Sequence, residues 1–291
     1  MKEKVLLEHM IINFLEKKKY STLRLNGCVD LLAKKNETYL LKILFNLDGL
    51  LEWHARSLQA MSHFLNSYPF VISMVTNRGR LEDDVIYIRF GLPAVTPKTF
   101  EKIVERKEKK KMAIKGKKVV EIDTKLLRER RIKLNFSLRE LAKKIGISKK
   151  ALYEIEKERV RPLAETAKKL EEILGIKLVK SYVPKVPEKT YAEPLTNFQK
   201  FVSSELKEKG IENSPVYTSK FNLVARMENS LISITKKKIK KYQVKTLERI
   251  ASFLDLKAFI VCEKTESYEL PVITRNELRK YSLEDILELL S

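Results

Sequence analysis

The stretch CVDLLAKKNETYLLKILFN, residues 28–46, has the pattern of two β-strands around a polar turn. Asp30 ends the apolar approach to the first strand, and Lys42 lies inside the second. An Asp on one strand and a carboxylate two residues before a Lys on the next strand can share a metal ion and a water molecule. Leu40 stands where that second carboxylate is required. The stretch therefore predicts the scaffold of a metal-dependent nuclease site with one ligand missing.

The composition limits the class of protein. The chain of 291 residues is long enough for two or three domains, each with its own hydrophobic core. Its residues are 44% hydrophobic and 33% charged, a balance typical of a globular protein. The formal net charge of +21 indicates a polyanionic partner, which is nucleic acid or, less often, an anionic membrane surface.

The sequence shows no sign of a membrane span or of a disulfide. No stretch approaches the roughly 18 consecutive apolar residues of a span, and residues 1–20 are interrupted by charge and lack a small-residue cleavage site. We therefore expect a cytoplasmic protein that does not enter a membrane. Cys28 and Cys262 lie in apolar, strand-like runs, where a small thiol packs well, so we expect core cysteines.

Two breaks divide the chain into three domains. RKEKKKMAIKGKK, residues 106–118, has eight basic residues against one Glu and no apolar periodicity, which predicts a basic linker over residues 106–123 that could also touch phosphate. VPKVPEKTYAEP, residues 183–194, contains three prolines and predicts a stiff linker over residues 180–195. The predicted domains are residues 1–105, 124–179 and 196–291.

The two outer domains resemble each other. SHFLNSYPFVISMVT, residues 62–76, matches ASFLDLKAFIVCEKT, residues 251–265, and LPAVT at residue 92 matches LPVIT at residue 270. Each copy has the pattern of a helix, two strands around a turn, a helix, a strand, then a short strand and a closing helix. The opening helices are expected at residues 4–19 and 196–209. This alternation favours an α/β sandwich in both copies.

The middle domain has the pattern of two short helices joined by a glycine turn. Ser137 followed by Glu140 predicts a capping box, and Gly146 ends that helix in a tight turn. Ser148 caps a second helix, residues 148–156, which places Leu152 and Ile155 inward. The residues expected to face outward are Lys149, Lys150, Tyr153, Glu154 and Lys157. This is a helix-turn-helix whose second helix is small enough to enter a major groove.

LLRERRIKLNFSLRELAKKIGISKKALYEIEKERVRP, followed by LAETAKKLEEILG, resembles the Cro and phage-repressor class of helix-turn-helix domains over about fifty residues. The resemblance implies a recognition helix at residues 148–156 with Arg139 and Arg161 on the DNA backbone. The residues implied to bind DNA are Ser137, Arg139, Ser148, Lys149, Lys150, Ala151, Tyr153, Lys157 and Arg161. One departure is Leu138, which stands where many members have a Gln brace.

Acidic residues of the recognition helix need a different role. Glu154 and Glu156 would repel phosphate if they faced DNA, so we expect them to pair with nearby Lys or Arg side chains. Residues 124–179 contain sixteen Lys or Arg against eight Glu, and such a surface predicts phosphate binding with a steep salt dependence.

The first outer copy resembles the restriction-endonuclease-like fold, as in archaeal Holliday-junction resolvases, through Glu8, Asp30 and Lys42. In that family the acidic residues bind a divalent cation, and the Lys orients or activates the attacking water. Asp48 and Glu52 are candidates for a migrated ligand. The alternative for Asp30 is a strand-end cap or an ion-pair partner of Lys42, which needs no metal.

The second copy departs further from a nuclease. Asn222 stands where Asp30 does, Ser233 or a neighbour stands near the place of Lys42, and Gln199 and Lys200 replace Glu8 in the opening helix. KKKIKKYQVK, residues 236–245, carries six lysines and no acid. This run is either a solvated surface or a DNA-backbone contact.

The order of a nuclease-like copy, a helix-turn-helix and a second copy resembles an archaeal family of helix-turn-helix transcriptional regulators, also through VDLLAKKNETYLLKILFNLDGL and LPAVTPKTF. The expected fold is therefore two degenerate restriction-endonuclease-like α/β sandwiches flanking a repressor-type helix-turn-helix bundle. We expect a regulator that binds double-stranded DNA sequence-specifically, without catalysis or a cofactor, as a homodimer or with the two copies in pseudo-symmetry.

Two alternatives stay open at the level of sequence. The first is a metal-dependent, structure-specific DNA endonuclease that uses Mg²⁺ or Mn²⁺ with Glu8, Asp30, Lys42 and a migrated acid. In the second, the first copy binds a partner or a nucleotide effector and switches the central domain.

Overall fold

The computed structural model describes residues 2–25, 27–105, 111–114, 117–180, 182–218, 220–227, 229–264 and 268–290. The chain forms two compact units. One comprises residues 1–78, 90–92 and 185–291, and the other comprises residues 79–89 and 93–184. The predicted boundary at residue 105 therefore differs from the observed grouping, because residues 93–104 belong to the unit that contains the helix-turn-helix. Within the first unit we call residues 2–78 lobe one and residues 185–290 lobe two.

Lobe one contains the two strands predicted around the polar turn. Its elements are α1 (Lys2–Lys17), β1 (Ser21–Arg24), β2 (Leu31–Lys34), β3 (Thr38–Ile43), η1 (Leu47–Gly49), α2 (Glu52–Phe64), β4 (Tyr68–Ile72) and β5 (Val75–Thr76). Strands β1, β2 and β3 are antiparallel neighbours, and β3 pairs in parallel with β4. Both faces of β2 and β3 are largely buried, which explains their nearly continuous apolar sequence.

Lobe two repeats this order of elements. They are α8 (Asn197–Glu208), β11 (Glu212–Pro215), β12 (Leu223–Arg226), β13 (Ser230–Thr235), α9 (Lys241–Leu254), β14 (Lys257–Cys262), β15 (Val272–Thr274), α10 (Arg275–Lys280) and α11 (Leu283–Leu290). Strands β11, β12 and β13 are antiparallel, and β13, β14 and β15 are parallel. The β12–β13 pair has the same strand lengths and the same burial pattern as β2–β3. The predicted internal repeat is therefore confirmed.

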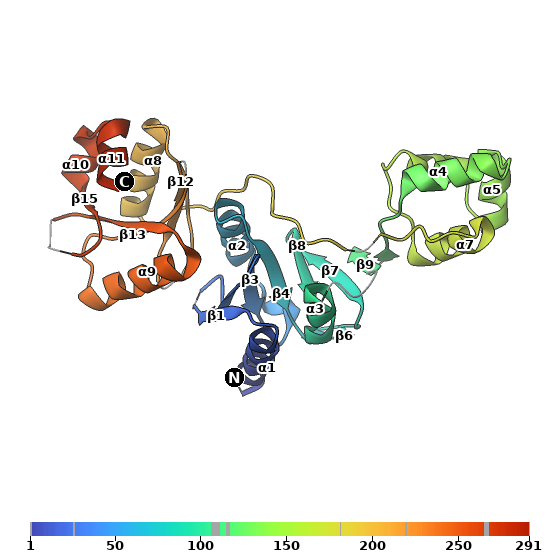
Figure 1. Ribbon diagram of the computed structural model, residues 1–291, viewed down its shortest axis with the longest axis horizontal. Coiled ribbons are helices and arrows are strands. Elements are labelled where there is room, and N and C mark those ends of the chain that lie inside the picture. Colours follow the sequence, from blue (N-terminus) through green and yellow to red (C-terminus); the bar gives the residue numbers. More distant parts are fainter. Residues whose placement is uncertain are drawn as a thin grey trace. The chain divides into compact units, whose positions relative to one another are not determined.

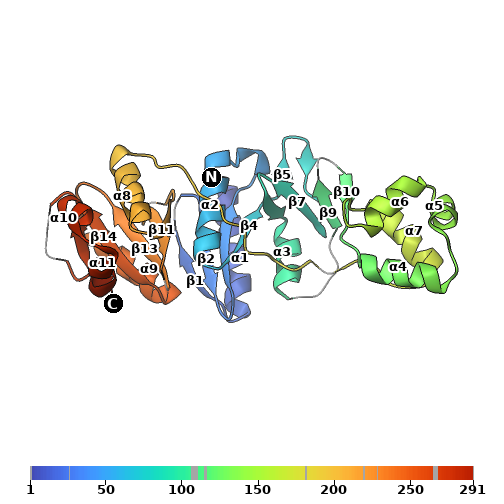
Figure 2. The same ribbon diagram turned by 90° about the horizontal axis from the view of Figure 1, so that it is seen from above.

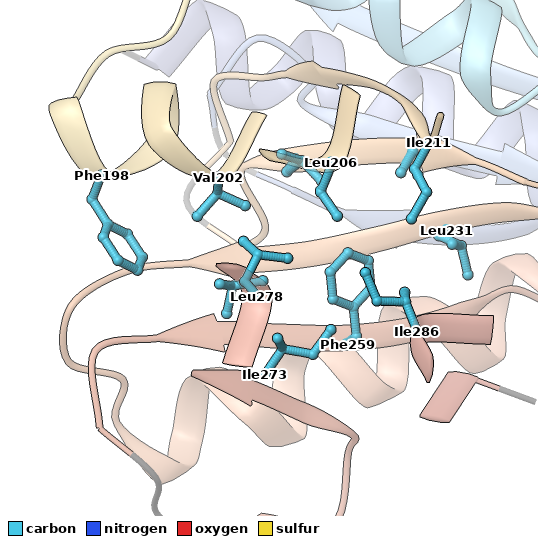
Figure 3. Close-up of a cluster of buried hydrophobic side chains, with 12 residues drawn as sticks. Phe198, Val202, Leu206, Ile211, Leu231, Phe259, Ile273, Leu278 and Ile286 are labelled. Atoms are coloured by element: carbon cyan, nitrogen blue, oxygen red, sulfur yellow. The ribbon is translucent and has the colours of Figure 1, made fainter. Parts of the chain in front are cut away.

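Helices cover both faces of the lobe-two sheet. Figure 1 shows α9 on one side of β13 and α8, α10 and α11 on the other. The close-up in Figure 3 shows Phe198, Val202 and Leu206 of α8 directed toward the sheet, in the same buried cluster as Leu231 and Phe259 of the strands. The next residue along β13, Ile232, is also buried but points to the opposite face, because side chains alternate along a strand.

The second unit begins with short strands and a helix. These are β6 (Gly79–Arg80), β7 (Val85–Arg89), β8 (Leu92–Val95), α3 (Pro97–Val104), β9 (Lys111–Ile114) and β10 (Lys117–Val119). The prediction of a linker over residues 106–123 is wrong for β9 and β10, which form an antiparallel hairpin. Strand β9 also pairs in parallel with β7, and this distant partner leaves no periodic signal in such a short segment. Residues 106–110, 115 and 116 of the predicted linker lie outside the described residues.

The predicted helix-turn-helix is a bundle of four helices, shown in green in Figure 2. They are α4 (Thr124–Lys133), α5 (Leu138–Ile145), α6 (Lys149–Glu156) and α7 (Ala164–Leu174). Leu127, Leu141, Leu152 and Leu170 meet in its core. The backbone before α4 is fixed to the segment after α7, because the amide of Asp123 donates to the carbonyl of Leu178 at 2.8 Å.

The proline-containing segment contains no helix or strand at its described positions 182–194. Residues from Lys185 onward belong to the same unit as the two lobes. The Tyr191 hydroxyl donates to Glu212 at 2.7 Å, and the amide of Ala192 donates to Ser214 at 2.9 Å. The segment is thus attached to lobe two as well as stiffened by its prolines. Across the described parts of the chain, no helix has the length and apolarity needed to cross a membrane.

Candidate nucleic-acid interface and the nuclease-like centre

The turn between α5 and α6 has the geometry that the sequence predicts. Ser137 and Glu140 form a capping box: the Ser137 hydroxyl accepts from the Glu140 amide at 3.2 Å, and the Glu140 carboxylate accepts from the Ser137 amide at 2.8 Å. Gly146 ends α5 in the left-handed conformation with φ of 77°, which a residue with a Cβ adopts only at a cost. Ser148 then caps α6 by accepting from the amide of Ala151 at 3.0 Å.

Helix α6 separates its apolar and basic residues onto two faces. Leu152 and Ile155 are buried in the core of the bundle, as predicted. The residues on the solvent side are Lys149, Lys150, Tyr153 and Lys157, all exposed, and Ala151, which is partly exposed. The predicted outward residues are therefore accessible together on one short helix, the arrangement that a recognition helix requires.

The surroundings of α6 suit phosphate. The Ser137 and Ser148 hydroxyl oxygens accept hydrogen bonds within their caps, so each hydroxyl proton can still be donated to a phosphate oxygen. The positive ends of α5 and α6 lie beside these serines. Arg139 is exposed in the first turn of α5. Lys157 lies 5.9 Å from the centre of the Tyr153 ring, so a cation–π contact orders these two side chains.

The predicted pairing of Glu154 and Glu156 within the domain is confirmed. Arg131 of α4 makes two hydrogen bonds to the Glu156 carboxylate, at 2.7 and 3.1 Å, and a third to the carbonyl of Phe136 at 2.8 Å. Arg159 lies 3.4 Å from Glu154. The first pair is nearly buried and therefore fixes α6 on α4, whereas the second is more exposed.

Arg161 is less free than the sequence indicates. Its guanidinium donates to Glu121 at 2.9 Å, in the strand-like segment that precedes α4. Leu138, which occupies the position of the family's Gln brace, is partly buried against the core of the bundle. The first turn of α5 is thus held by apolar packing and by its capping box.

In lobe one, Asp30 and Lys42 meet in a buried centre. Asp30 Oδ2 accepts from the amide of Ile43 at 2.8 Å and lies 3.2 Å from Lys42 Nζ, while Lys42 also donates to the carbonyl of Gly27 at 2.7 Å. The two side chains are only 5% and 7% exposed. Asp30 thus makes the two contacts that the alternative of a strand-end cap or an ion-pair partner of Lys42 predicts.

Lys4 is a third member of this centre that the sequence did not reveal. Its ammonium lies 2.8 Å from Asp30 Oδ1 and 3.8 Å from Glu8 Oε1. The only available signal was the spacing of Lys4 and Glu8, which places both on one face of a helix. Glu8 and Asp30 are the two acids that a cation would need, and here they share an ammonium group.

The centre does not fit a divalent cation. Leu40 is completely buried and offers no oxygen. Asp48 accepts from the amide of Asn77 at 2.7 Å, and Glu52 pairs with Arg56 at 2.9 Å, so neither candidate for a migrated ligand joins Asp30. Throughout the described residues, no group of three His, Cys, Asp or Glu side chains is arranged to bind a metal. A hard divalent cation needs several oxygen ligands, whereas the two carboxylates of this centre, Glu8 and Asp30, lie beside ammonium groups and Leu40 adds no oxygen.

His54 lies beside the same centre. Burial, together with the positive charges of Lys42 and Lys4 and against the opposing effect of Asp30, lowers the pKa of His54 to about 4. His54 is therefore neutral at pH 7.

Lobe two has a neutral counterpart of this centre. Asn222 Oδ1 accepts from the amide of Thr235 at 2.7 Å, just as Asp30 accepts from Ile43. This correspondence places Ile234 where lobe one has Lys42, so the neighbour of Ser233 is the true equivalent. Gln199 donates to the carbonyl of Asn222 at 2.5 Å. Amides and an aliphatic side chain have thus replaced every charge.

Comparisons with known proteins agree with both parts of this description. The PD-(D/E)XK superfamily domain matches residues 4–110, and a helix-turn-helix domain matches residues 127–180. The chain is 32% identical over 280 residues to the "Putative HTH-type transcriptional regulatory protein" of Methanocaldococcus jannaschii. The alignment covers 91% of this chain and 87% of the relative. The chain belongs to this archaeal family. No solved structure matches it.

A second family member, from Pyrococcus furiosus, is also named as a putative HTH-type transcriptional regulatory protein. It is 31% identical over 280 residues, and the alignment covers 91% of this chain and 89% of the relative. The expected fold, nuclease-like domains with a helix-turn-helix, is confirmed for this family member. The superfamily match covers lobe one. Lobe two has the same order of elements as lobe one.

The Arg131–Glu156 pair should hold the recognition helix in place. Glu156→Gln leaves a nearly buried guanidinium without a counter-charge, and we expect a loss of about 3 kcal/mol in the local free energy of unfolding. Hydrogen–deuterium exchange of the α6 amides measures this loss. Glu154→Gln is the matched control, because its exposed partner predicts a change below about 1 kcal/mol. Equal effects of the two substitutions would contradict the assignment.

Stability should fall in mild acid because of His54. Its pKa of about 4 in the folded chain lies below the ordinary value of 6.5, so between these pH values the unfolded chain binds a proton that the folded chain does not. The free energy of unfolding, measured by urea denaturation, should therefore decrease as the pH falls through this range. His54→Gln should flatten the dependence, whereas His9→Gln, at an exposed position of α1, should preserve it.

Proposed function

We propose that the protein is a transcriptional regulator that binds double-stranded DNA sequence-specifically through α6. The observation that carries this proposal is the exposed row formed by Lys149, Lys150, Tyr153 and Lys157 on a helix whose other face is buried. The naming of the relatives as putative HTH-type transcriptional regulators and the helix-turn-helix match support it. Lysine ammonium groups can donate to guanine O6 and N7, and a tyrosine can contact a thymine methyl group or a phosphate.

The flanking lobes have a structural role in this proposal. They hold and orient the DNA-binding domain, and they need no metal and no cofactor. The protein acts in the cytoplasm as a homodimer, so that two recognition helices meet half-sites about one helical turn apart. A complex with two chains per operator in sedimentation analysis is expected.

Removing the two lysines at the start of α6 should weaken operator binding most. Lys149→Ala combined with Lys150→Ala removes two donors to base edges, each worth about 1–3 kcal/mol of discrimination, so operator affinity should fall by about 30-fold or more. Binding to random duplex DNA should fall less, because phosphate contacts elsewhere persist. Fluorescence anisotropy with a selected operator and a random duplex, at one fixed salt concentration, measures both values.

A matched control removes the same charge from the same domain. Lys168 and Lys169 are exposed on α7, and Lys168→Ala with Lys169→Ala should leave the preference for operator over random DNA unchanged. If the α6 variant instead lost affinity equally for operator and random DNA, α6 would not be the element that reads sequence.

The nuclease alternative retains one supporting observation, the match of lobe one to the PD-(D/E)XK superfamily domain. Our proposal predicts no cleavage of linear or branched DNA with Mg²⁺ or Mn²⁺, because Lys4 and Lys42 surround Asp30 and Leu40 replaces a ligand. Incubation of the pure protein with labelled four-way junctions and linear duplexes tests this. Cutting that disappears in Asp30→Ala would establish the alternative instead.

A further inference from the structure

A cavity of about 320 Å³ lies within the first unit, where lobe one and lobe two meet. Three separate segments form its wall: the end of β1, the turn before β12, and one face of α9. Its lining residues are Leu23, Arg24, Leu25, Lys220, Lys245, Thr246, Arg249 and Ile250. The DNA-binding helix α6 contributes nothing to this cavity.

The cavity is strongly basic. Four of its side chains, those of Arg24, Lys220, Lys245 and Arg249, are cationic, and none of its lining residues is acidic. Lys245 and Arg249 are four residues apart on α9 and so share one face of that helix. Among the described residues, none of these four cations has an acidic partner within ion-pair distance. Four like charges around one hollow repel each other, and an anion between them relieves that repulsion.

The remaining lining and the size indicate what kind of anion fits. Leu23, Leu25 and Ile250 supply an apolar part, and Leu25 and Ile250 are almost completely buried. Small-molecule pockets commonly measure about 300–1,000 Å³, so this cavity is at the lower end of that range. It has room for one nucleotide or a molecule of similar size. A phosphate-bearing molecule with a less polar portion matches both parts of the wall.

The two lobes contact each other directly beside the cavity. Gly27 forms a β-bridge with Thr218, and the amide of Cys28 donates to the carbonyl of Tyr217 at 2.7 Å. A Cβ at Gly27 would lie 2.8 Å from the Cα of Thr218 and would also meet the Tyr217 carbonyl, so only glycine permits this approach. Lys34 of lobe one also pairs with Asp255 of lobe two at 2.5 Å. These contacts bring the cations of both lobes to one cavity.

We propose that this cavity binds a small phosphorylated molecule of mononucleotide size with at least two phosphate groups. Arg24 from lobe one and Lys220, Lys245 and Arg249 from lobe two bind the phosphates, while Leu23, Leu25 and Ile250 contact the less polar portion. Ligand binding joins the two lobes, because cations of both lobes bind the same anion. This site is separate from α6 and does not depend on the proposed reading of DNA.

Isothermal titration of the full chain with ADP and with pyrophosphate, at low salt, tests the proposal. We expect saturable binding of one ligand per chain. Arg24→Gln and Arg249→Gln should each weaken it about tenfold or more, because each removes a charged hydrogen-bond donor to phosphate. Lys241→Gln is the matched control: it removes one exposed charge from the first turn of α9, outside the cavity, and should change affinity less than about twofold.

The same proteins separate this site from a contact with DNA phosphates. Affinity for a random duplex should be unchanged in Arg24→Gln and Arg249→Gln, and thermal unfolding without ligand should match the wild type, because both arginines are exposed. Failure of the wild type to bind either probe would overturn the proposal. Equal weakening by Lys241→Gln, or a loss of duplex affinity in the cavity variants without ADP binding, would overturn it as well.

Discussion

The central strand pair of each lobe is joined by the same hydrogen bond from a backbone amide to a side-chain oxygen. In lobe one the Asp30 carboxylate accepts from the amide of Ile43, and in lobe two the Asn222 amide oxygen accepts from Thr235. Each bond joins the residue that precedes one central strand, β2 or β12, to the last residue of the next strand, β3 or β13. Because Asn makes this bond as well as Asp, the position serves the hairpin even where no charge remains. The acid that resembles a metal ligand is thus, first, a structural residue.

This dual role explains why the nuclease-like scaffold persists without a cation site. A buried carboxylate needs positive partners, and Lys4 and Lys42 supply them from two different elements. Lobe two contains no buried carboxylate at this place and so needs no cationic partner. Asn222, Ile234 and Gln199 occupy the corresponding positions. The same position therefore has a charged cluster in lobe one and a neutral amide cluster in lobe two. In both, the buried polar groups have hydrogen-bond partners.

Local features of the structure could be predicted from the sequence, whereas long-range pairings could not. The capping box at Ser137, the turn at Gly146 and the inward Leu152 and Ile155 follow from neighbours within four residues. The repeat was visible because matching segments have matching order. Lys4 beside Asp30, Arg131 beside Glu156, and strand β9 beside β7 join residues at least 25 positions apart. No periodicity encodes such contacts, so the sequence predicts a linker over residues 106–123, where the structure has β9 and β10.

The bridge at Gly27 has a consequence for how the two copies can differ. In a homodimer, every substitution appears on both sides of the interface, so a change that suits one side must be tolerated by the other. Here the second copy is part of the same chain, and its association with the first does not depend on protein concentration. A substitution in one lobe therefore leaves the sequence of the other lobe unchanged. Lys245 and Arg249 on α9 of lobe two and the charged centre of lobe one are examples of such differences between the two copies.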